Sequence, residues 1–329
     1  MDLSRRRFLN TSTASGAALA ISGFTSVAAE TDLLPIIDTH QHLWDLDKFT
    51  LPWIAGDSEP AVLKRSYVTK DFVAATKGLN VVKAVYMEVD VREDLQVNEA
   101  EHVIALSKSP EHPTAAAVIS GRPASDKFAN YITKYRDTPE IKGVRQVLQV
   151  PSTPQGFCLG EQFVKSVQLL GTMSKSFDLC MRPMELSDGA KLAEKCPDTR
   201  CIVDHCGNAD PKAWLPKSRQ GDKAPWHDVD TWKRGIDALA KQKNVICKIS
   251  GIIARAPKDW SAEDLVAPIN FCLDTFGPNR VIYGGDWPVC KVTAPYAVWV
   301  KALKEVIASR PVAEQKNLLH DNAVTFYGL

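Results

Sequence analysis

The run IIDTHQH (residues 36–42) is the first of eight short apolar segments that recur along the 329-residue chain. The others cover 81–89, 114–121, 141–148, 177–183, 200–207, 245–251 and 281–288, and each is rich in residues that favour strands. Amphipathic helical patterns lie between them at 94–108, 125–138, 160–174, 231–243 and 261–277. Strands that alternate with helices indicate a parallel sheet, and eight such units favour a closed (β/α)8 TIM barrel.

An open doubly wound sheet is the alternative arrangement of the same elements. Such sheets commonly cradle phosphates, yet no G-x-G-x-x-G follows the first segment and no G-x-x-x-x-G-K-[ST] occurs in the chain. Two long insertions, 43–70 and 208–230, follow the carboxyl ends of the first and sixth segments. Barrel enzymes build their sites at that face, so we expect these loops to shape a binding pocket.

The first 29 residues form a pattern typical of a twin-arginine export signal. Ser4-Arg5-Arg6-Arg7-Phe8-Leu9 precedes an uncharged stretch from 11 to 29, with seven Ser or Thr among its nineteen residues. That stretch is too polar for a good membrane anchor. We therefore expect two parts, a signal peptide (1–29) and a single barrel domain (30–329), in a protein exported to the periplasm.

The charge balance argues against a polyanionic partner. Removing 1–29 deletes three arginines and one aspartate, which changes 40 basic and 39 acidic residues to 37 and 38. A net charge near −1 predicts no nucleic-acid binding. No later segment is apolar for long enough to span a membrane, and the sequence leaves the oligomeric state open.

Chemically active side chains gather at the carboxyl ends of the predicted strands. His40 and His42 are two residues apart and share one face of the first strand. Other strands end in Glu88, Arg145, His205, Lys248 and Asp286. So many polar groups are costly in a core and useful in a site. Aromatic side chains that would stack on a sugar ring there are Trp44, Trp53 and Trp287.

Four motifs together resemble the amidohydrolase-related family. They are D-T-H-x-H (38–42), D-H-x-G (204–207), G-x-D-W-P (284–288) and the terminal N-A-x-x-F-Y (322–327). Within that family the chain is most similar to sugar-lactone hydrolases of the L-fuconolactonase and L-rhamnonolactonase type. The resemblance implies a (β/α)8 hydrolase in which His40, His42, His205 and Asp286 surround the scissile carbonyl.

The family often binds zinc, and this sequence departs from the binuclear pattern. Its fifth strand, FDLCMRP, has no histidine, and Lys142 stands at the start of the fourth strand. Two mechanisms remain open. In one, His40, His42 and Asp286 bind a single zinc that activates water. In the other, Asp286 is the general base, His205, Lys248 and Arg145 stabilise the oxyanion, and no cofactor is obligatory.

Three classes of function remain. The first is a hydrolase that opens a small lactone, with the sugar unspecified. The second is a zinc-dependent amidohydrolase or non-oxidative decarboxylase on the same fold. The third is a non-catalytic periplasmic binding protein. We expect the first, with a small-molecule lactone as the partner and no zinc requirement.

Overall fold

Eight parallel strands form one sheet in chain order in the computed structural model, which describes residues 34–56 and 60–329. Their bounds are β1 (Ile36–Gln41), β2 (Val81–Met87), β3 (Thr114–Ser120), β4 (Ile141–Val147), β5 (Ser176–Cys180), β6 (Cys201–Val203), β7 (Val245–Ile249) and β8 (Val281–Tyr283). Each lies within or overlaps one of the eight predicted segments. The predicted strands are therefore confirmed, although each ends one to five residues earlier than its apolar run suggested.

The first and last strands meet and nearly close the sheet into a barrel. Gln41 forms a parallel bridge with Trp287, and the backbone N–H of His42 donates to the carbonyl of Trp287 at 2.8 Å. The N–H of Gly285 donates to Oδ1 of Asp38 at 2.7 Å. These contacts join the two edges, so the chain forms the expected TIM-type barrel and not an open sheet.

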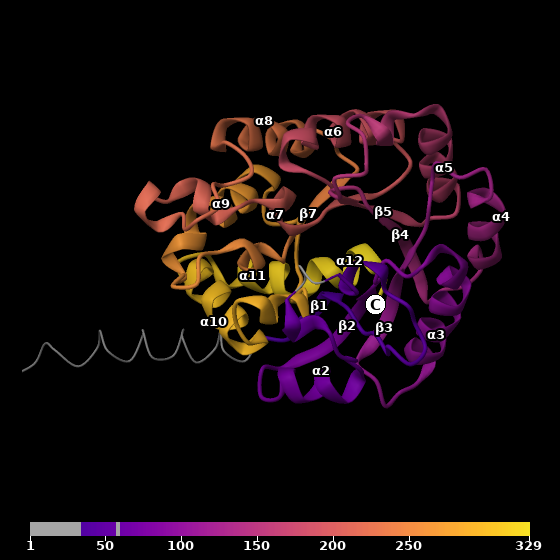
Figure 1. Cartoon of the computed structure of the whole chain (residues 1–329), viewed down its shortest axis with the longest axis horizontal. Coiled ribbons are helices and arrows are strands. Elements are labelled where there is room, and N and C mark those ends of the chain that lie inside the picture. The colour runs from indigo at the N-terminus through magenta and orange to yellow at the C-terminus, as the bar shows by residue number, and fades with distance from the viewer. Residues whose placement is uncertain (1–33, 57–59) are drawn as a thin grey trace, which may run out of the picture.

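The helices surround the strands, as Figure 1 shows. Their bounds are α2 (Thr69–Thr76), α3 (Gln96–Lys108), α4 (Phe128–Ile132), α5 (Glu161–Thr172), α6 (Leu186–Lys195), α7 (His205–Asn208), α8 (Val229–Ala240), α9 (Glu263–Phe276), α10 (Tyr296–Ile307), α11 (Val312–Lys316) and α12 (Asn322–Tyr327). The five helical patterns expected from the sequence correspond to α3, α4, α5, α8 and α9. None of the helices in the described ranges has the length and apolar character needed to cross a bilayer.

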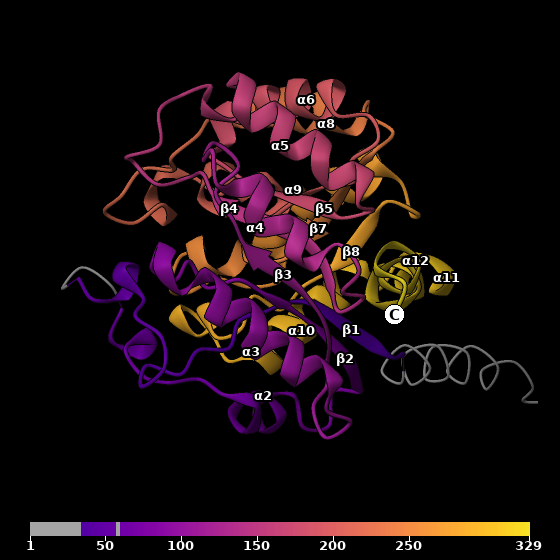
Figure 2. The ribbon, with the colours of Figure 1, turned by 90° about the vertical axis from the view of Figure 1, so that its right-hand side faces the viewer.

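The barrel interior is packed at one end and hollow at the other. Ile37, Ile202 and Ile282 of three strands form one apolar cluster with Ala323 and Tyr327 of α12. Figure 2 shows α11 and α12 together at that end. The strand carboxyl ends face the opposite way, so polar residues there surround an opening. The predicted signal peptide lies outside the described residues.

Candidate active site

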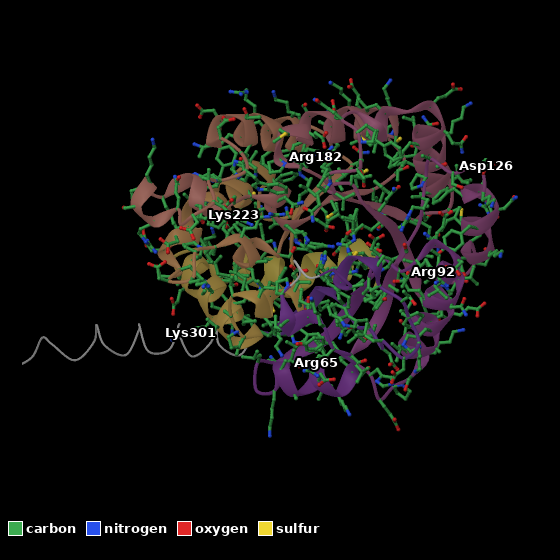
Figure 3. All side chains as sticks on the ribbon, in the orientation of Figure 1. Arg65, Arg92, Asp126, Arg182, Lys223 and Lys301 are labelled. Atoms are coloured by element: carbon green, nitrogen blue, oxygen red, sulfur yellow. The ribbon has the colours of Figure 1, made fainter. Side chains whose placement is uncertain are left out.

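A cavity of about 480 Å³ opens at the carboxyl ends of the strands. Its wall includes His42 after β1, Arg145 of β4, His205 after β6 and Asp286 after β8. Trp53 also lines it, from the first insertion. Figure 3 shows side chains filling the space between strands and helices, with labelled residues such as Lys301 at the edge. The strand ends thus bring the main predicted site residues to one hollow, as in other barrels.

The backbone is strained where two of these side chains are presented. All four residues of α7 have positive φ, from 52° to 64°, and Asp286 has φ 52°. Non-glycine residues rarely adopt this region, and such strain concentrates at functional sites. Gly251 lies opposite α7, and a Cβ there would clash with the imidazole of His205. The glycine therefore leaves room for His205, whose Nδ1 lies 2.8 Å from Oγ of Ser250.

His42 and Asp286 place two acceptor atoms side by side. Nδ1 of His42 lies 3.0 Å from the carbonyl oxygen of Met87, which can only accept, so Nδ1 carries the hydrogen. In the neutral ring Nε2 then carries a lone pair. It lies 3.3 Å from Oδ1 of Asp286, which is also an acceptor when ionised. A proton, a metal ion or a donating water between the two atoms would satisfy both.

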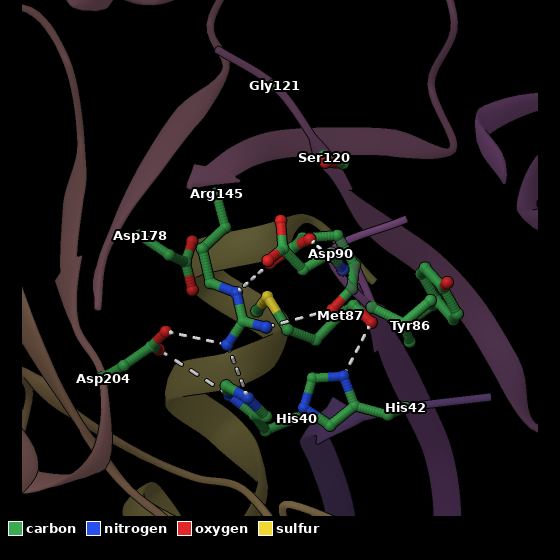
Figure 4. A network of polar contacts seen from close by, with 12 residues as sticks. His40, His42, Tyr86, Met87, Asp90, Ser120, Gly121, Arg145, Asp178 and Asp204 are labelled. Atoms are coloured by element: carbon green, nitrogen blue, oxygen red, sulfur yellow. Dashed lines mark hydrogen bonds and ion pairs between the residues drawn. The ribbon is translucent and has the colours of Figure 1, made fainter. Parts of the chain in front are cut away.

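His40 is fixed in the opposite tautomer by Arg145. Nη1 of Arg145 donates to Nε2 of His40 at 3.2 Å, so the hydrogen of His40 is on Nδ1, which faces Oδ1 of Asp204 at 3.6 Å. Burial and the charge of Lys248 lower the pKa of His40 well below its usual value, so the ring is neutral. Arg145 is itself held by Glu88, through its Nε at 2.6 Å from Oε1. Figure 4 shows this network.

A second charged layer lies beneath the cavity floor. Nζ of Lys248 lies 2.7 Å from Oδ2 of Asp178 and 3.1 Å from Oδ1 of Asp204. Burial alone would raise the pKa of Asp204, but Lys248, His205 and Arg145 outweigh it and lower that pKa to about 2. Burial raises the pKa of Asp178 to about 7, although Lys248 acts in the opposite direction. Asp204 is thus the stronger acid of the two, and its carboxylate lies 3.6 Å from Nδ1 of His40 and 3.6 Å from Nη1 of Arg145.

Five residues expected to meet a substrate do not line the cavity, and one of them is His40, which is fully buried and contacts Arg145 instead. Lys248 is fully buried between its two carboxylates, which corrects the expectation that it stabilises an oxyanion directly. Glu88 is also fully buried and acts through Arg145. Trp44 and Trp287 are 1% exposed and pack edge-on against Tyr67, so they build the wall behind the cavity and cannot stack on a sugar.

The sequence reasoning missed Asp204 and Asp178. Asp204 directly precedes His205 in the D-H-x-G motif, and Asp178 is the one charged residue of its buried strand, between Phe177 and Leu179. A charge inside an apolar strand is a signal that it has a buried partner. The identity of that partner, Lys248, depends on the order of β5, β6 and β7 in the barrel.

The donor set fits one zinc ion, with one opposing feature. His40, His42 and Asp286 each offer an atom within 4.8 Å of the others, and two imidazoles with a carboxylate form a usual catalytic zinc set. Zinc held there would polarise a carbonyl and acidify a bound water. However, Nε2 of His40 already accepts from a guanidinium, whose positive charge opposes a dication. A zinc ion at this site would therefore compete with Arg145 for the Nε2 lone pair of His40.

The barrel thus holds two imidazoles, a carboxylate and a guanidinium together at the face where barrel enzymes act. The family model for amidohydrolases matches residues 37–329, and the chain belongs to that family. An L-fucono-1,5-lactonase of Burkholderia multivorans is 26% identical over 291 residues, which cover 86% of this chain and 92% of that protein.

Two solved structures share the fold. One is an amidohydrolase from Burkholderia multivorans with bound zinc, with TM-score 0.75, 24% identity, and 90% and 99% of the two chains covered. The other is a 5-carboxyvanillate decarboxylase from Novosphingobium aromaticivorans complexed with manganese, with TM-score 0.60, 14% identity, and 91% and 99% covered. At these identities the likeness concerns the fold alone. The relatives thus include lactonases by sequence and both hydrolases and decarboxylases by fold.

Proposed function

We propose that this protein hydrolyses a small lactone, with Asp286 as the base that takes a proton from the attacking water. The observation that carries the proposal is the pair of acceptors, Oδ1 of Asp286 and Nε2 of His42, that stand 3.3 Å apart beside the cavity. A water that donates one hydrogen to each would keep an oxygen lone pair free for attack. This geometry suits general base catalysis.

The remaining groups stabilise the charge that develops during attack. The water oxygen bonds to the lactone carbonyl carbon and its proton passes to Asp286. The carbonyl oxygen becomes negative within reach of the Arg145 cation, which Glu88 holds in place, and of Nε2 of His205. The ring C–O bond then breaks, and the alkoxide takes the proton back from Asp286. His40 keeps Arg145 oriented.

A lactone suits this site better than an amide. An alkoxide leaving group needs less protonation in the transition state than an amine does, so a carboxylate base and fixed cations are sufficient. The cavity volume of about 480 Å³ is in the range of small-molecule sites. The similarity to an L-fucono-1,5-lactonase supports a sugar lactone as substrate.

A substrate panel tests the proposal. Five- and six-membered sugar lactones are offered with a pH indicator, because each ring opening releases a proton, and simple amides and aromatic acids are offered alongside. We expect acidification with at least one lactone. Amide cleavage, CO2 release from aromatic acids, or tight binding without turnover, in each case with no lactone opened, would contradict the proposal.

A further inference from the structure

Arg255 places a guanidinium in the cavity wall from the loop after β7. It ends the 3-10 helix Ile252–Arg255 and lines the cavity together with Gln149. The guanidinium carbon lies 3.6 Å from the ring centroid of Trp226, in the second insertion. Nη2 donates to Oε1 of Gln149 at 3.3 Å. Stacking on an aromatic face fixes the plane of the guanidinium and leaves its edges free to donate.

Two other charged groups of the wall, Arg145 and Asp90, are neutralised by an ion pair. Arg145 pairs with Glu88 at 2.6 Å, and Asp90 pairs with Arg122 at 2.7 Å. Asp286 faces the imidazole of His42. Within residues 34–56 and 60–329, no ion pair of 4.0 Å or less to Arg255 is present. Arg255 is therefore the cation of the wall without a contacting countercharge.

An anionic ligand could supply the countercharge that Arg255 lacks among the described residues. Burial lowers the pKa of Arg255, although Asp210 acts in the opposite direction, and an arginine stays charged in either case. A partly buried cation is costly without a partner, and a guanidinium edge matches a carboxylate through two parallel hydrogen bonds. The amide of Gln149, which accepts from Arg255, keeps its own N–H groups for the same ligand.

We propose that Arg255, with Gln149, binds a carboxylate carried by the substrate, so that the substrates are lactones of sugar acids with a second acid group. This inference rests on the proposed function and narrows its substrate class. The second carboxylate is distinct from the one that hydrolysis creates, because the new carboxylate forms beside Asp286, His42 and Arg145. Arg255 would then set which lactones are selected and in which orientation they bind.

The test compares two lactones that share one ring, one with a hydroxymethyl group and one with a carboxylate in its place. We expect the wild type to show a kcat/KM at least about tenfold higher for the acid lactone. In Arg255→Gln the ratio of the two kcat/KM values falls towards one, mainly through KM for the acid lactone, and Arg255→Lys retains part of it. An unchanged ratio in Arg255→Gln, or a wild type without preference for the acid, would overturn the inference.

A matched control and a binding measurement separate this inference from the proposed function. Arg65 lies beside α2 at the edge of the molecule, with its guanidinium 4.0 Å from the ring centroid of Tyr67 (Figure 3). Arg65→Gln removes the same kind of stacked cation away from the cavity, and we expect the ratio of the two kcat/KM values to stay as in the wild type.

If neither lactone is opened, the proposed function fails. Calorimetry with galactaric acid then decides the inference, since binding should be lost in Arg255→Gln and unaffected in Arg65→Gln.

Discussion

Two histidines from one motif take different tasks because their neighbours differ. His42 gives its Nδ1 hydrogen to the carbonyl of Met87, which turns the Nε2 lone pair towards Asp286. His40 uses its Nε2 lone pair to accept from Arg145. In the proposed mechanism, His42 therefore helps to hold a water or a proton, and His40 positions the guanidinium of Arg145. A motif that reads H-x-H shows that two rings share a face, and only their partners assign the roles.

The buried, neutral His40 makes stability depend on pH. Its pKa is below 6.5 in the folded state, so between the folded pKa and 6.5 the unfolded chain binds a proton that the folded protein does not. Stability from this group is therefore present above about pH 6.5 and is lost as the pH falls. Urea unfolding of the wild type and His40→Gln between pH 8 and 5 should show their difference falling by up to about 1.4 kcal/mol per pH unit. A difference that stays flat would show that His40 titrates normally.

Nε2 of His40 already accepts a hydrogen bond from the positively charged Arg145, so it is not free to bind zinc. We therefore expect that activity does not require zinc. Protein purified without added metal should contain well below one zinc per chain, or should lose little lactone turnover when a chelator removes it. Elemental analysis with assays before and after chelation measures both. Full occupancy with strict dependence would show that His40 releases Arg145 to become a ligand with His42 and Asp286.

The sequence predicts most of the residues that gather at the cavity, but it does not predict how deeply some of the expected site residues are buried. His40, His42, Arg145, His205 and Asp286 could be predicted because each lies near the carboxyl end of an apolar strand. Lys248 has the same sequence signature, yet it is fully buried with Asp178 and Asp204, and this depends on how far each strand extends into the barrel. The same holds for Trp44 and Trp287. The alternation of residues along a strand predicts which face of the sheet a side chain is on. Its position along the barrel axis, and so whether it reaches the cavity, depends on strand length and register.

At the scale of elements, α7 and the loop after β7 present His205. The sequence DHCG could be predicted to end a strand, but four consecutive residues with positive φ could not, because His205, Cys206 and Asn208 are not glycine. Tertiary contacts impose this turn. Trp232 of α8 donates its Nε1 hydrogen to the carbonyl of Cys206 at 2.8 Å, and Asn208 donates to the carbonyl of Met181 at 3.0 Å.

Gly251→Ala should lower lactone turnover at least about tenfold by displacing His205. The new methyl group meets the imidazole, and the misplacement of a catalytic group typically costs at least tenfold in rate. Gly78→Ala is the matched control, since Gly78 also has positive φ (81°) but has nothing within 4 Å of the added Cβ. Gly78→Ala should cost about 1 kcal/mol in urea unfolding because of its positive φ, and Gly251→Ala should cost more because it adds the clash with His205. Equal turnover of the two variants on the same lactone would show that the position of His205 does not matter.

At the scale of the whole molecule, the eight strands of the barrel could be predicted from the sequence, but the contacts that close it between the first and last strands could not. The alternation of strands and helices predicts eight units, whereas the contact between the first and last strands includes bonds to a buried side chain that this alternation does not predict. Oδ1 of Asp38 accepts from Gly285, and Oδ2 accepts from the hydroxyl of Tyr296 at 3.0 Å. Asp38 thereby joins β1, the segment after β8 and α10, and it fixes the backbone next to Asp286.

The family model matches residues 37–329, so the twin-arginine pattern lies outside the matched segment. We propose that residues 1–29 direct export of the folded protein. Replacing Arg5 and Arg6 by Lys should keep the protein in the cytoplasm, because receptors of this route read the arginine pair. Cell fractionation followed by immunoblotting measures the distribution. Normal export of the double variant would contradict the proposal.

The role of Asp286 as the base is tested most directly by the turnover of Asp286→Asn on a lactone that the wild type opens. Asparagine keeps the size of the side chain and removes the basic oxygen, and loss of a general base typically lowers the rate by about 10²–10⁴-fold. Asp90→Asn is the matched control, since Asp90 also lines the cavity and has positive φ (47°). We predict that Asp286→Asn unfolds at the urea concentration of the wild type or higher and still binds the hydroxy-acid product in calorimetry. Its kcat should fall at least about 100-fold, while the kcat of Asp90→Asn should fall less than about tenfold. Wild-type kcat in Asp286→Asn would show that this carboxylate is structural and that the proposed mechanism is wrong.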